Sequence, residues 1–273
     1  MPKKNTLILL VGPSCSGKDS ILSQIVHAIP SIKKLKRCIT REPREGETGD
    51  PDIEFNTLDQ YNAISSDKKM DSRSYEMYNS KGKPITVFYS NIVPQELLGV
   101  EKRCENTYIG ITTLDGLLQI DDNKLITEYF NIVGINVVVS EDIRIKRYIN
   151  RVSKDKNSIS YNTVKEILRR MDKDREDFSE ERFSTICKQL KNIAVWSVDG
   201  SRNLSVVTTD VKHLMMNKMN KNETLKAIES ILLKFKDDTA ELIRDRNSID
   251  ASTCTKISSY PANLLKEIIK EAY

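Results

Sequence analysis

The stretch "VGPSCSGKDS", Val11 to Ser20, decides the fold of this chain. Gly12 to Lys18 match the pattern G-x-x-x-x-G-K of a phosphate-binding loop, or P-loop. The stretch follows a short apolar run, "TLILLV", typical of a buried parallel strand, and precedes a helical pattern, "DSILSQIVHAI". In such a loop the backbone amides converge on an oxyanion at a helix N-terminus, and the lysine reaches the outer phosphates. We therefore predict a phosphate site made by Gly12, Pro13, Ser14, Cys15, Ser16, Gly17, Lys18, Asp19 and Ser20.

The same alternation of strand and helix continues along the chain. The apolar runs "TYIGI" and "GINVVVS" are followed by the helical patterns "TLDGLLQIDDNKLITEYF" and "EDIRIKRYINRV". A last candidate strand is "LSVVTT", after which Asp210 is placed to cap a helix. This order predicts an α/β fold of the P-loop NTPase type, in which helices cross over between the strands of a parallel sheet.

Two regions depart from this alternation. Between about Thr48 and Glu105, "SRSYEMYN" and "PITVFYS" are joined by "SKGK" and predict an antiparallel hairpin in a separate, mixed β/α lobe. Beyond about Lys218, "NETLKAIESILLKFKDD" carries apolar residues on one helical face and predicts a helical C-terminal extension. We expect this face to pack on the parent domain or on a second copy of the chain.

Charge and composition limit the possible partners. The 273 residues include 43 Lys and Arg against 39 Asp and Glu, a net charge of only +4, so charge alone gives no argument for a nucleic-acid partner. No apolar run approaches the roughly 20 residues that cross a bilayer, which predicts a cytoplasmic protein without a membrane partner. The 5 cysteines are scattered without a CxxC pair, which favours reduced thiols over disulfides or a zinc site.

A second motif, "TREPREGE", lies about 25 residues after the P-loop. Arg41 and Arg44 flank Pro43, and Glu47 closes the turn. Two guanidinium groups three residues apart on a loop stiffened by proline can each donate two parallel hydrogen bonds to one phosphate. We interpret the motif as a second phosphate site rather than as a solvated charge run, because the P-loop precedes it.

Taken together, "GPSCSGK" and "TREPREGE" resemble guanylate kinases in their order and separation. "EILRRMDKDREDFSEERF" is similar to the helix after the lid in a bacterial guanylate kinase-like branch that also has Lys-Asp in the P-loop. The resemblance covers roughly residues 5–215. It implies a kinase domain at 1–218, with an acceptor-binding lobe at about 36–105 and a lid at about 153–165, followed by the extension at 219–273.

The resemblance also implies a role for each matching residue. Lys18 and the loop amides are expected to bind ATP, and Arg41, Arg44 and Glu47 to bind the acceptor phosphate. Arg147, Arg151 and Arg170 match arginines that close over the transferring phosphoryl group. Phosphoryl transfer depends on such positioning and charge neutralisation rather than on a protein nucleophile. We therefore expect a nucleotide-binding transferase that uses ATP and Mg²⁺.

Several residues depart from the family pattern, mainly in the acceptor lobe. Ile53 stands where the family has a tyrosine, and Arg37 stands where a serine is expected. The family's Y-G-[ST] turn has two competing registers here, and the favoured one, at Lys81, places Tyr75, Glu76 and Tyr78 on a strand that faces the acceptor. GMP or dGMP is the first acceptor to consider, with Glu76 and Tyr78 as candidate contacts.

Asp19 occupies the position where the usual loop has a Ser or Thr that binds Mg²⁺. A carboxylate beside phosphate is repulsive unless a metal ion offsets the charge. Asp19 could bind Mg²⁺ directly or through water, or Ser20 could do so from the next position. Asp19 could also simply stabilise the positive end of the helix.

Three functions therefore remain open. The first is an ATP-dependent nucleoside monophosphate kinase. The second is a non-catalytic guanylate kinase-like module that binds a protein through the acceptor lobe. The third is a P-loop kinase for another phosphorylated small molecule. Lys18 and the arginine set favour an enzyme, whereas the missing tyrosines favour the module or a different substrate. A homodimer through residues 219–273 is a further possibility.

Overall fold

A computed structural model of the chain describes residues 4–43, 47–78, 83–97, 106–153 and 161–218. The chain divides into two units, Met1–Thr208 and Thr209–Tyr273. The first unit contains the P-loop and both sheets. The predicted domain boundary at 218 stays a prediction. The predicted C-terminal extension, 219–273, lies outside the described residues, and so does the homodimer interface predicted there. Residues 154–160 of the predicted lid, Arg44 and Lys81 also lie outside them.

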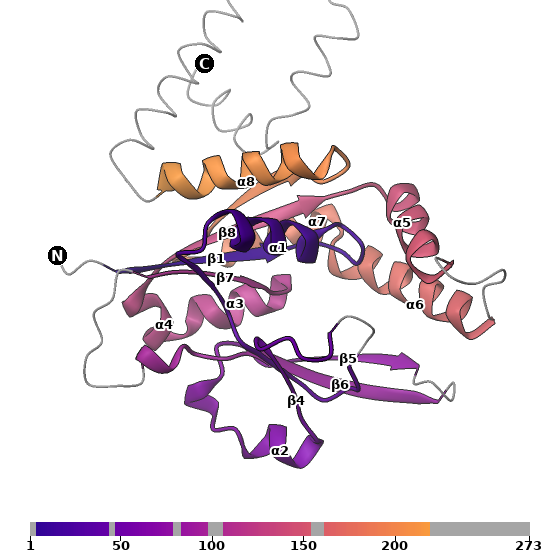
Figure 1. Ribbon diagram of the computed structural model, residues 1–273, viewed down its shortest axis with the longest axis horizontal. Coiled ribbons are helices and arrows are strands. Elements are labelled where there is room, and N and C mark those ends of the chain that lie inside the picture. The colour runs from indigo at the N-terminus through magenta and orange to yellow at the C-terminus, as the bar shows by residue number, and fades with distance from the viewer. Residues whose placement is uncertain (1–3, 44–46, 79–82, 98–105, 154–160, 219–273) are drawn as a thin grey trace, which may run out of the picture. The chain divides into compact units, whose positions relative to one another are not determined.

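The centre of the first unit is a parallel sheet of 5 strands in the order β2-β7-β1-β8-β9. β1 pairs with β7 on one side and with β8 on the other, all in parallel (Figure 1). This arrangement confirms the predicted α/β fold, and it places the P-loop at the carboxyl end of the middle strand. The strands are β1 (Asn5–Val11), β2 (Ile32–Lys34), β7 (Thr107–Ile111), β8 (Phe130–Val138) and β9 (Ala194–Asp199).

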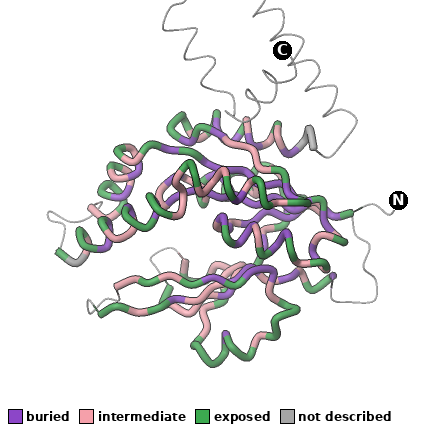
Figure 2. Tube along the Cα trace, turned by 180° about the vertical axis from the view of Figure 1, so that it is seen from behind, coloured by how far each residue is buried: buried purple, intermediate pink, exposed green. Residues whose placement is uncertain are grey.

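Helices cover both faces of this sheet because β1 is apolar on both sides. Leu7, Leu9 and Val11 pack in one cluster with residues of α3 (Leu114–Asp122), α4 (Lys124–Tyr129) and α7 (Glu180–Gln189). Ile8 and Leu10 are also fully buried and point to the opposite face, where α1 (Lys18–Ala28) lies (Figure 1). Figure 2 shows buried residues running along these central strands. The remaining helices are α5 (Glu141–Ser153), α6 (Tyr161–Asp177) and α8 (Leu204–Lys218).

A second sheet, of 4 strands in the order β4-β3-β6-β5, forms the predicted lobe. β5 and β6 pair antiparallel, as the hairpin prediction required. A buried carboxylate, Asp71, joins this lobe to the main sheet: it accepts hydrogen bonds from the Asn91 amide and the Thr112 hydroxyl, both at 2.7 Å. The elements are β3 (Arg37–Ile39), β4 (Ile53–Phe55), α2 (Leu58–Ala63), β5 (Arg73–Tyr78), β6 (Pro84–Asn91), and the 3-10 turns Ser66–Lys68 and Gln95–Leu97.

Two predicted elements are wrong in detail. "LSVVTT" is the start of α8 rather than a strand, and Asp210 lies inside that helix instead of capping one. The Asn203 side chain accepts a hydrogen bond from the Ser205 amide, so the β-branched residues that follow continue as a helix despite their strand propensity. Among the described residues the last strand is β9, in which only Val198 is buried, so its apolar pattern is weak.

The predicted long helix after β7 is two helices. Asn123 interrupts it, and the Asn123 side chain accepts a hydrogen bond from the Ile126 amide at 3.4 Å, which caps α4. A short polar side chain that bonds to the backbone favours a cap over a helix interior. The break lets α4 end at Tyr129, directly before β8.

Candidate active site

The P-loop turns sharply between β1 and α1, and glycine is required at both of its ends. Gly12 has φ +142°, and a Cβ there would lie 2.6 Å from the Val137 carbonyl oxygen. Gly17 has φ +101° at the N-cap of α1. These conformations are accessible mainly to glycine, and the absence of a side chain at Gly12 lets the loop pass close to β8.

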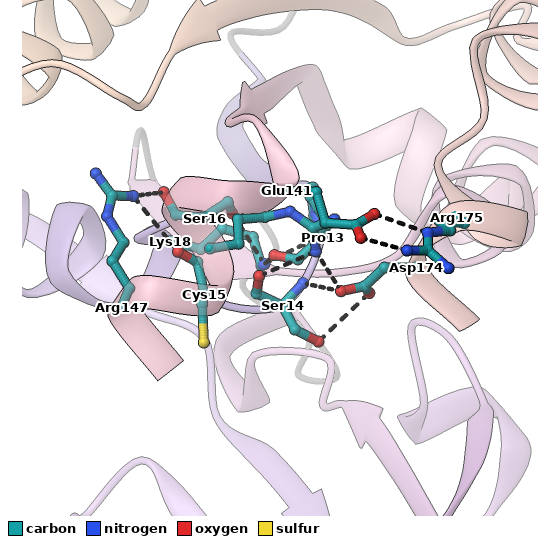
Figure 3. Close-up of polar contacts among 11 residues, drawn as sticks. Pro13, Ser14, Cys15, Ser16, Lys18, Glu141, Arg147, Asp174 and Arg175 are labelled. Atoms are coloured by element: carbon teal, nitrogen blue, oxygen red, sulfur yellow. Dashed lines mark hydrogen bonds and ion pairs between the residues drawn. The ribbon is translucent and has the colours of Figure 1, made fainter. Parts of the chain in front are cut away.

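Lys18 folds back over the loop (Figure 3). Its ammonium donates to the carbonyl oxygens of Gly12 and Pro13, both at 2.7 Å, and to the Ser16 hydroxyl at 3.3 Å. Burial lowers the pKa of Lys18, and attraction to Asp19 and Asp174 opposes this shift only in part. An incoming phosphate would therefore meet a desolvated cation, whose attraction for an anion is stronger than in water.

A cavity of about 370 Å³ lies over the loop. Its floor is formed by Cys15 to Ile21, while Gly12, Pro13 and Ser14 do not line it. Three arginines reach this cavity: Arg147 and Arg151 from α5, and Arg202 from the turn after β9. The structure thus brings together two of the predicted phosphoryl-closing arginines with the loop, and adds Arg202, which the sequence analysis missed.

Arg147 is held by backbone carbonyls rather than by a carboxylate. Its guanidinium donates to the carbonyl oxygens of Ser16, at 3.2 Å, and Gly200, at 2.8 Å. These carbonyl contacts fix the position of the guanidinium, and the Asp199 carboxylate interacts with it through charge attraction. Arg147 is thus a positioned cation at the edge of the cavity.

Arg151 and Arg170 meet at one aromatic ring. Their guanidinium carbons lie 4.8 Å and 5.4 Å from the centroid of the Tyr148 ring. Arg170 also donates from Nε to Glu166 at 2.7 Å. Burial lowers the pKa of Arg170, but Tyr148, Glu166 and Tyr75 raise it more, so this arginine stays protonated. The adjacent Arg169 pairs with the same Glu166 carboxylate and is the more exposed of the two arginines.

On the acceptor lobe, Arg41 forms a two-point ion pair with Glu47. The distances are 2.6 Å from Nη1 to Oε2 and 2.8 Å from Nη2 to Oε1. Burial lowers the pKa of Arg41, but the Glu47 hydrogen bond and Tyr75 raise it more. Tyr75 thus lies near both Arg41 and Arg170, so the lobe and α6 approach each other around this ring.

The two candidate contacts next to Tyr75 on β5 lie differently. Glu76 is exposed, and alternation along the strand points it away from the face of Tyr75. The ring of Tyr78 lies 4.6 Å from the Lys165 ammonium at the start of α6. On the Tyr75 side, Arg73 stacks over the Tyr89 ring at 4.0 Å. No sequence motif marks Tyr89, because its pairing with Arg73 depends on the hairpin register.

Two of the residues that depart from the guanylate kinase pattern, Asp19 and Arg37, lie together in the structure. The Asp19 carboxylate is 3.8 Å from the Arg37 guanidinium, and its side chain is 81% exposed. Among the described residues, no three His, Cys, Asp or Glu side chains gather as they would around a tightly held metal ion. Mg²⁺ commonly uses one carboxylate together with substrate phosphates and waters, and the exposed Asp19 or the neighbouring Ser20 fits that pattern.

A buried ion pair behind the loop was also missed. The Asp174 carboxylate on α6 accepts a hydrogen bond from the Ser14 amide at 2.9 Å (Figure 3). It also accepts one from Arg144 on α5 at 2.6 Å. Asp174 lies one helical turn after Arg170, and Arg144 three residues before Arg147. In the sequence, only their spacing from Arg170 and Arg147 could have indicated Asp174 and Arg144 as functional residues.

Comparison with known proteins finds similarity both to a curated protein and to solved structures. Ribose 1,5-bisphosphate phosphokinase PhnN from Ruegeria sp. (strain TM1040) is 44% identical over 45 residues, which are 16% of this chain and 24% of that protein. The chain thus matches about a quarter of that relative's length. The crystal structure of guanylate kinase from Anaplasma phagocytophilum aligns with 82% of this chain and 90% of its own, at a TM-score of 0.47 and 12% identity. No protein-family model matches.

The Ruegeria protein is a kinase by name, and the Anaplasma structure is named as a guanylate kinase. The described part of the chain contains no helix that is both long and apolar enough to span a membrane. The predicted cytoplasmic location stays a prediction.

Proposed function

We propose that this chain is a guanylate kinase-like phosphotransferase that moves a phosphoryl group from Mg·ATP to a phosphorylated small molecule. The observation that carries the proposal is the cavity over the P-loop, where Lys18 meets Arg147 and Arg151. A binding module without a donor nucleotide would have no need for this concentration of positive charge over a phosphate loop. Phosphoryl transfer does need it, because its catalysis rests on positioning and charge neutralisation.

The donor phosphates are proposed to bind the amides from Cys15 onward and the Lys18 ammonium. Lys18 must then exchange its two loop carbonyls for phosphate oxygens, and the stronger interaction with an anion offsets that loss. Arg147, fixed by carbonyls, and Arg151 are placed to approach the transferring group. Mg²⁺ supplies further charge neutralisation when bound, with Asp19 or Ser20 as its proposed protein contact.

The acceptor phosphate is proposed to bind near Arg41, Tyr75 and Arg170. Glu47 forms an ion pair with the Arg41 guanidinium, so the proposed role of Glu47 is to orient Arg41. Arg41 remains charged, because its pKa is raised. The predicted partner Arg44 lies outside the described residues. A nucleoside monophosphate, with GMP or dGMP first, is the acceptor that the family resemblance suggests.

A bisphosphorylated sugar is the second candidate acceptor, and Arg37 favours it. This residue adds a guanidinium to the acceptor side, 3.8 Å from Asp19 of the loop. A neutral nucleobase offers no anionic group to an arginine, whereas a second phosphate does. The relative named for ribose 1,5-bisphosphate, similar over 45 residues, points to the same class of acceptor.

The test is ADP release from Mg·ATP with a panel of acceptors: GMP, dGMP, the other nucleoside monophosphates and ribose 1,5-bisphosphate. The proposal expects turnover that depends on one acceptor and is lost in Lys18→Met. If Arg37 binds a second phosphate, Arg37→Ser should raise KM for ribose 1,5-bisphosphate and leave KM for GMP unchanged. Failure of every acceptor, together with failure to bind ATP, would leave the non-catalytic module as the better account.

A further inference from the structure

We propose that Asp174 and Arg144 form a positioning clamp that fixes the P-loop against α6 and so sets where Arg170 lies relative to the donor phosphates. This inference rests on the proposed function for its effect on turnover, but the clamp itself is a structural claim. Neither residue belongs to the P-loop or to "TREPREGE", and neither lines the cavity.

The clamp has four hydrogen bonds, and the shortest of them, between Arg144 and Asp174, is buried. Asp174 Oδ2 accepts from the Ser14 amide at 2.9 Å and from Arg144 Nη1 at 2.6 Å, and Oδ1 accepts from the Ser14 hydroxyl at 3.3 Å. Arg144 also donates to the Ser14 carbonyl oxygen at 3.4 Å. The side chains of Arg144 and Asp174 are only 6% and 10% exposed. One loop residue is thus held through its amide, hydroxyl and carbonyl at once.

The clamp commits the Ser14 amide to a protein carboxylate. An amide that donates to Asp174 cannot also donate to a nucleotide phosphate, which agrees with a cavity floor that begins at Cys15. We infer that Ser14, which the P-loop pattern includes among the ATP-binding residues, serves instead as the anchor of the loop.

A carboxylate behind a phosphate site requires an explanation, because it repels the phosphates. Burial raises the pKa of Asp174, against attraction from Arg144, the Ser14 amide and Lys18. A buried ion pair adds little net stability compared with apolar side chains of the same volume. Its advantage is directional: hydrogen bonds at fixed angles orient the groups they join.

The hydrogen bonds between Asp174 and Ser14 would determine the position of Arg170 relative to the P-loop. Residues four apart lie on the same face of a helix, so Asp174 and Arg170 project from α6 in similar directions. Cys15 of the loop packs beside Tyr148, Ile167 and Met171, so the α5–α6 pair also contacts the loop next to the clamp. Fixing Ser14 to Asp174 therefore fixes the distance between the loop and Arg170.

The first test requires no activity. Hydrogen exchange of the Ser14 amide is compared in the wild type, Asp174→Ala and the control Asp172→Ala, which removes an exposed carboxylate from the same helix. Protection is expected to be lost in Asp174→Ala alone. Equal protection in all three proteins would overturn the clamp. The double variant Arg144→Met, Asp174→Leu is included because an apolar pair should preserve folding while it removes the bond to Ser14.

The second test measures turnover and assigns the effect to Arg170. A displacement of about 1 Å can reduce turnover about 100-fold, so kcat of the double variant should fall by about that factor. Its melting temperature should be unchanged, and its KM for ATP should stay within about threefold of the wild-type value. In an Arg170→Ala background the same change should have no further effect on kcat. An additive effect would show that the clamp does not act through Arg170. Absence of wild-type turnover would refute the proposed function, and the exchange result would still decide the clamp.

Discussion

Replacing Lys18 by methionine should separate catalysis from stability. Methionine is unbranched and only one atom shorter than lysine, but it removes the hydrogen bonds to Gly12, Pro13 and Ser16. At about 1.5 kcal/mol net for each bond from a charged donor, their loss costs about 4.5 kcal/mol. Removing the buried charge gives back several kcal/mol of this, because burial disfavours the ammonium and lowers its pKa. The free energy of unfolding should therefore change by less than about 2 kcal/mol.

Turnover should respond much more strongly. One preorganised group that stabilises transition-state charge contributes about 10²- to 10³-fold to kcat, and Lys18 is proposed to act on the transferred phosphoryl group. The assays are ADP release with the active acceptor and urea unfolding of the same preparations. Lys173→Met, an exposed lysine on α6, is the matched control and should retain activity. Wild-type turnover in Lys18→Met, or loss of folding in place of turnover, would refute the reasoning.

Three further predictions concern the loop and its surroundings. Asp19→Ala should raise the Mg²⁺ concentration needed for half-maximal turnover and barely alter stability, because its side chain is 81% exposed; an unchanged Mg²⁺ titration would exclude it from the metal site. Burial raises the pKa of Glu166 but two neighbouring arginines lower it more, so its stabilisation is fully present above pH about 4.5 and is lost as the pH falls through the lowered pKa. Glu166→Gln should therefore lower the melting temperature at pH 7 and much less at about pH 2. Gly12→Ala should lower the free energy of unfolding by more than Gly49→Ala, since both glycines have positive φ but only Gly12 lacks room for a Cβ. Equal decreases, measured by urea unfolding, would argue against the clash with β8.

The parts of the fold that the sequence predicted are those with a strong local signal. The P-loop has fixed spacing between a buried strand and a helix, and the hairpin has two apolar runs around a turn, so both were found. "LSVVTT" failed because its β-branched residues follow an Asn203 cap that starts a helix. The break at Asn123 failed for a similar reason: apolar periodicity does not show where a side chain caps the backbone.

The site was predictable only where the residues belong to a motif. Arg147 and Arg151 were found by resemblance and do line the cavity beside Lys18. The contact between Ser14 and Asp174 joins residues 160 positions apart, and no local pattern encodes it. The same holds for the position of Tyr75 near Arg41 and Arg170, which depends on how the lobe and α6 meet.

The most direct test of the central claim follows the γ-phosphate of ATP. ATP labelled in that phosphate is incubated with the protein, Mg²⁺ and each acceptor, and the products are separated by chromatography. The account predicts label on one phosphorylated acceptor with the wild type, and none with Lys18→Met. Label that appears only as inorganic phosphate, or remains in ATP with every acceptor, would contradict the claim that this site transfers phosphoryl groups.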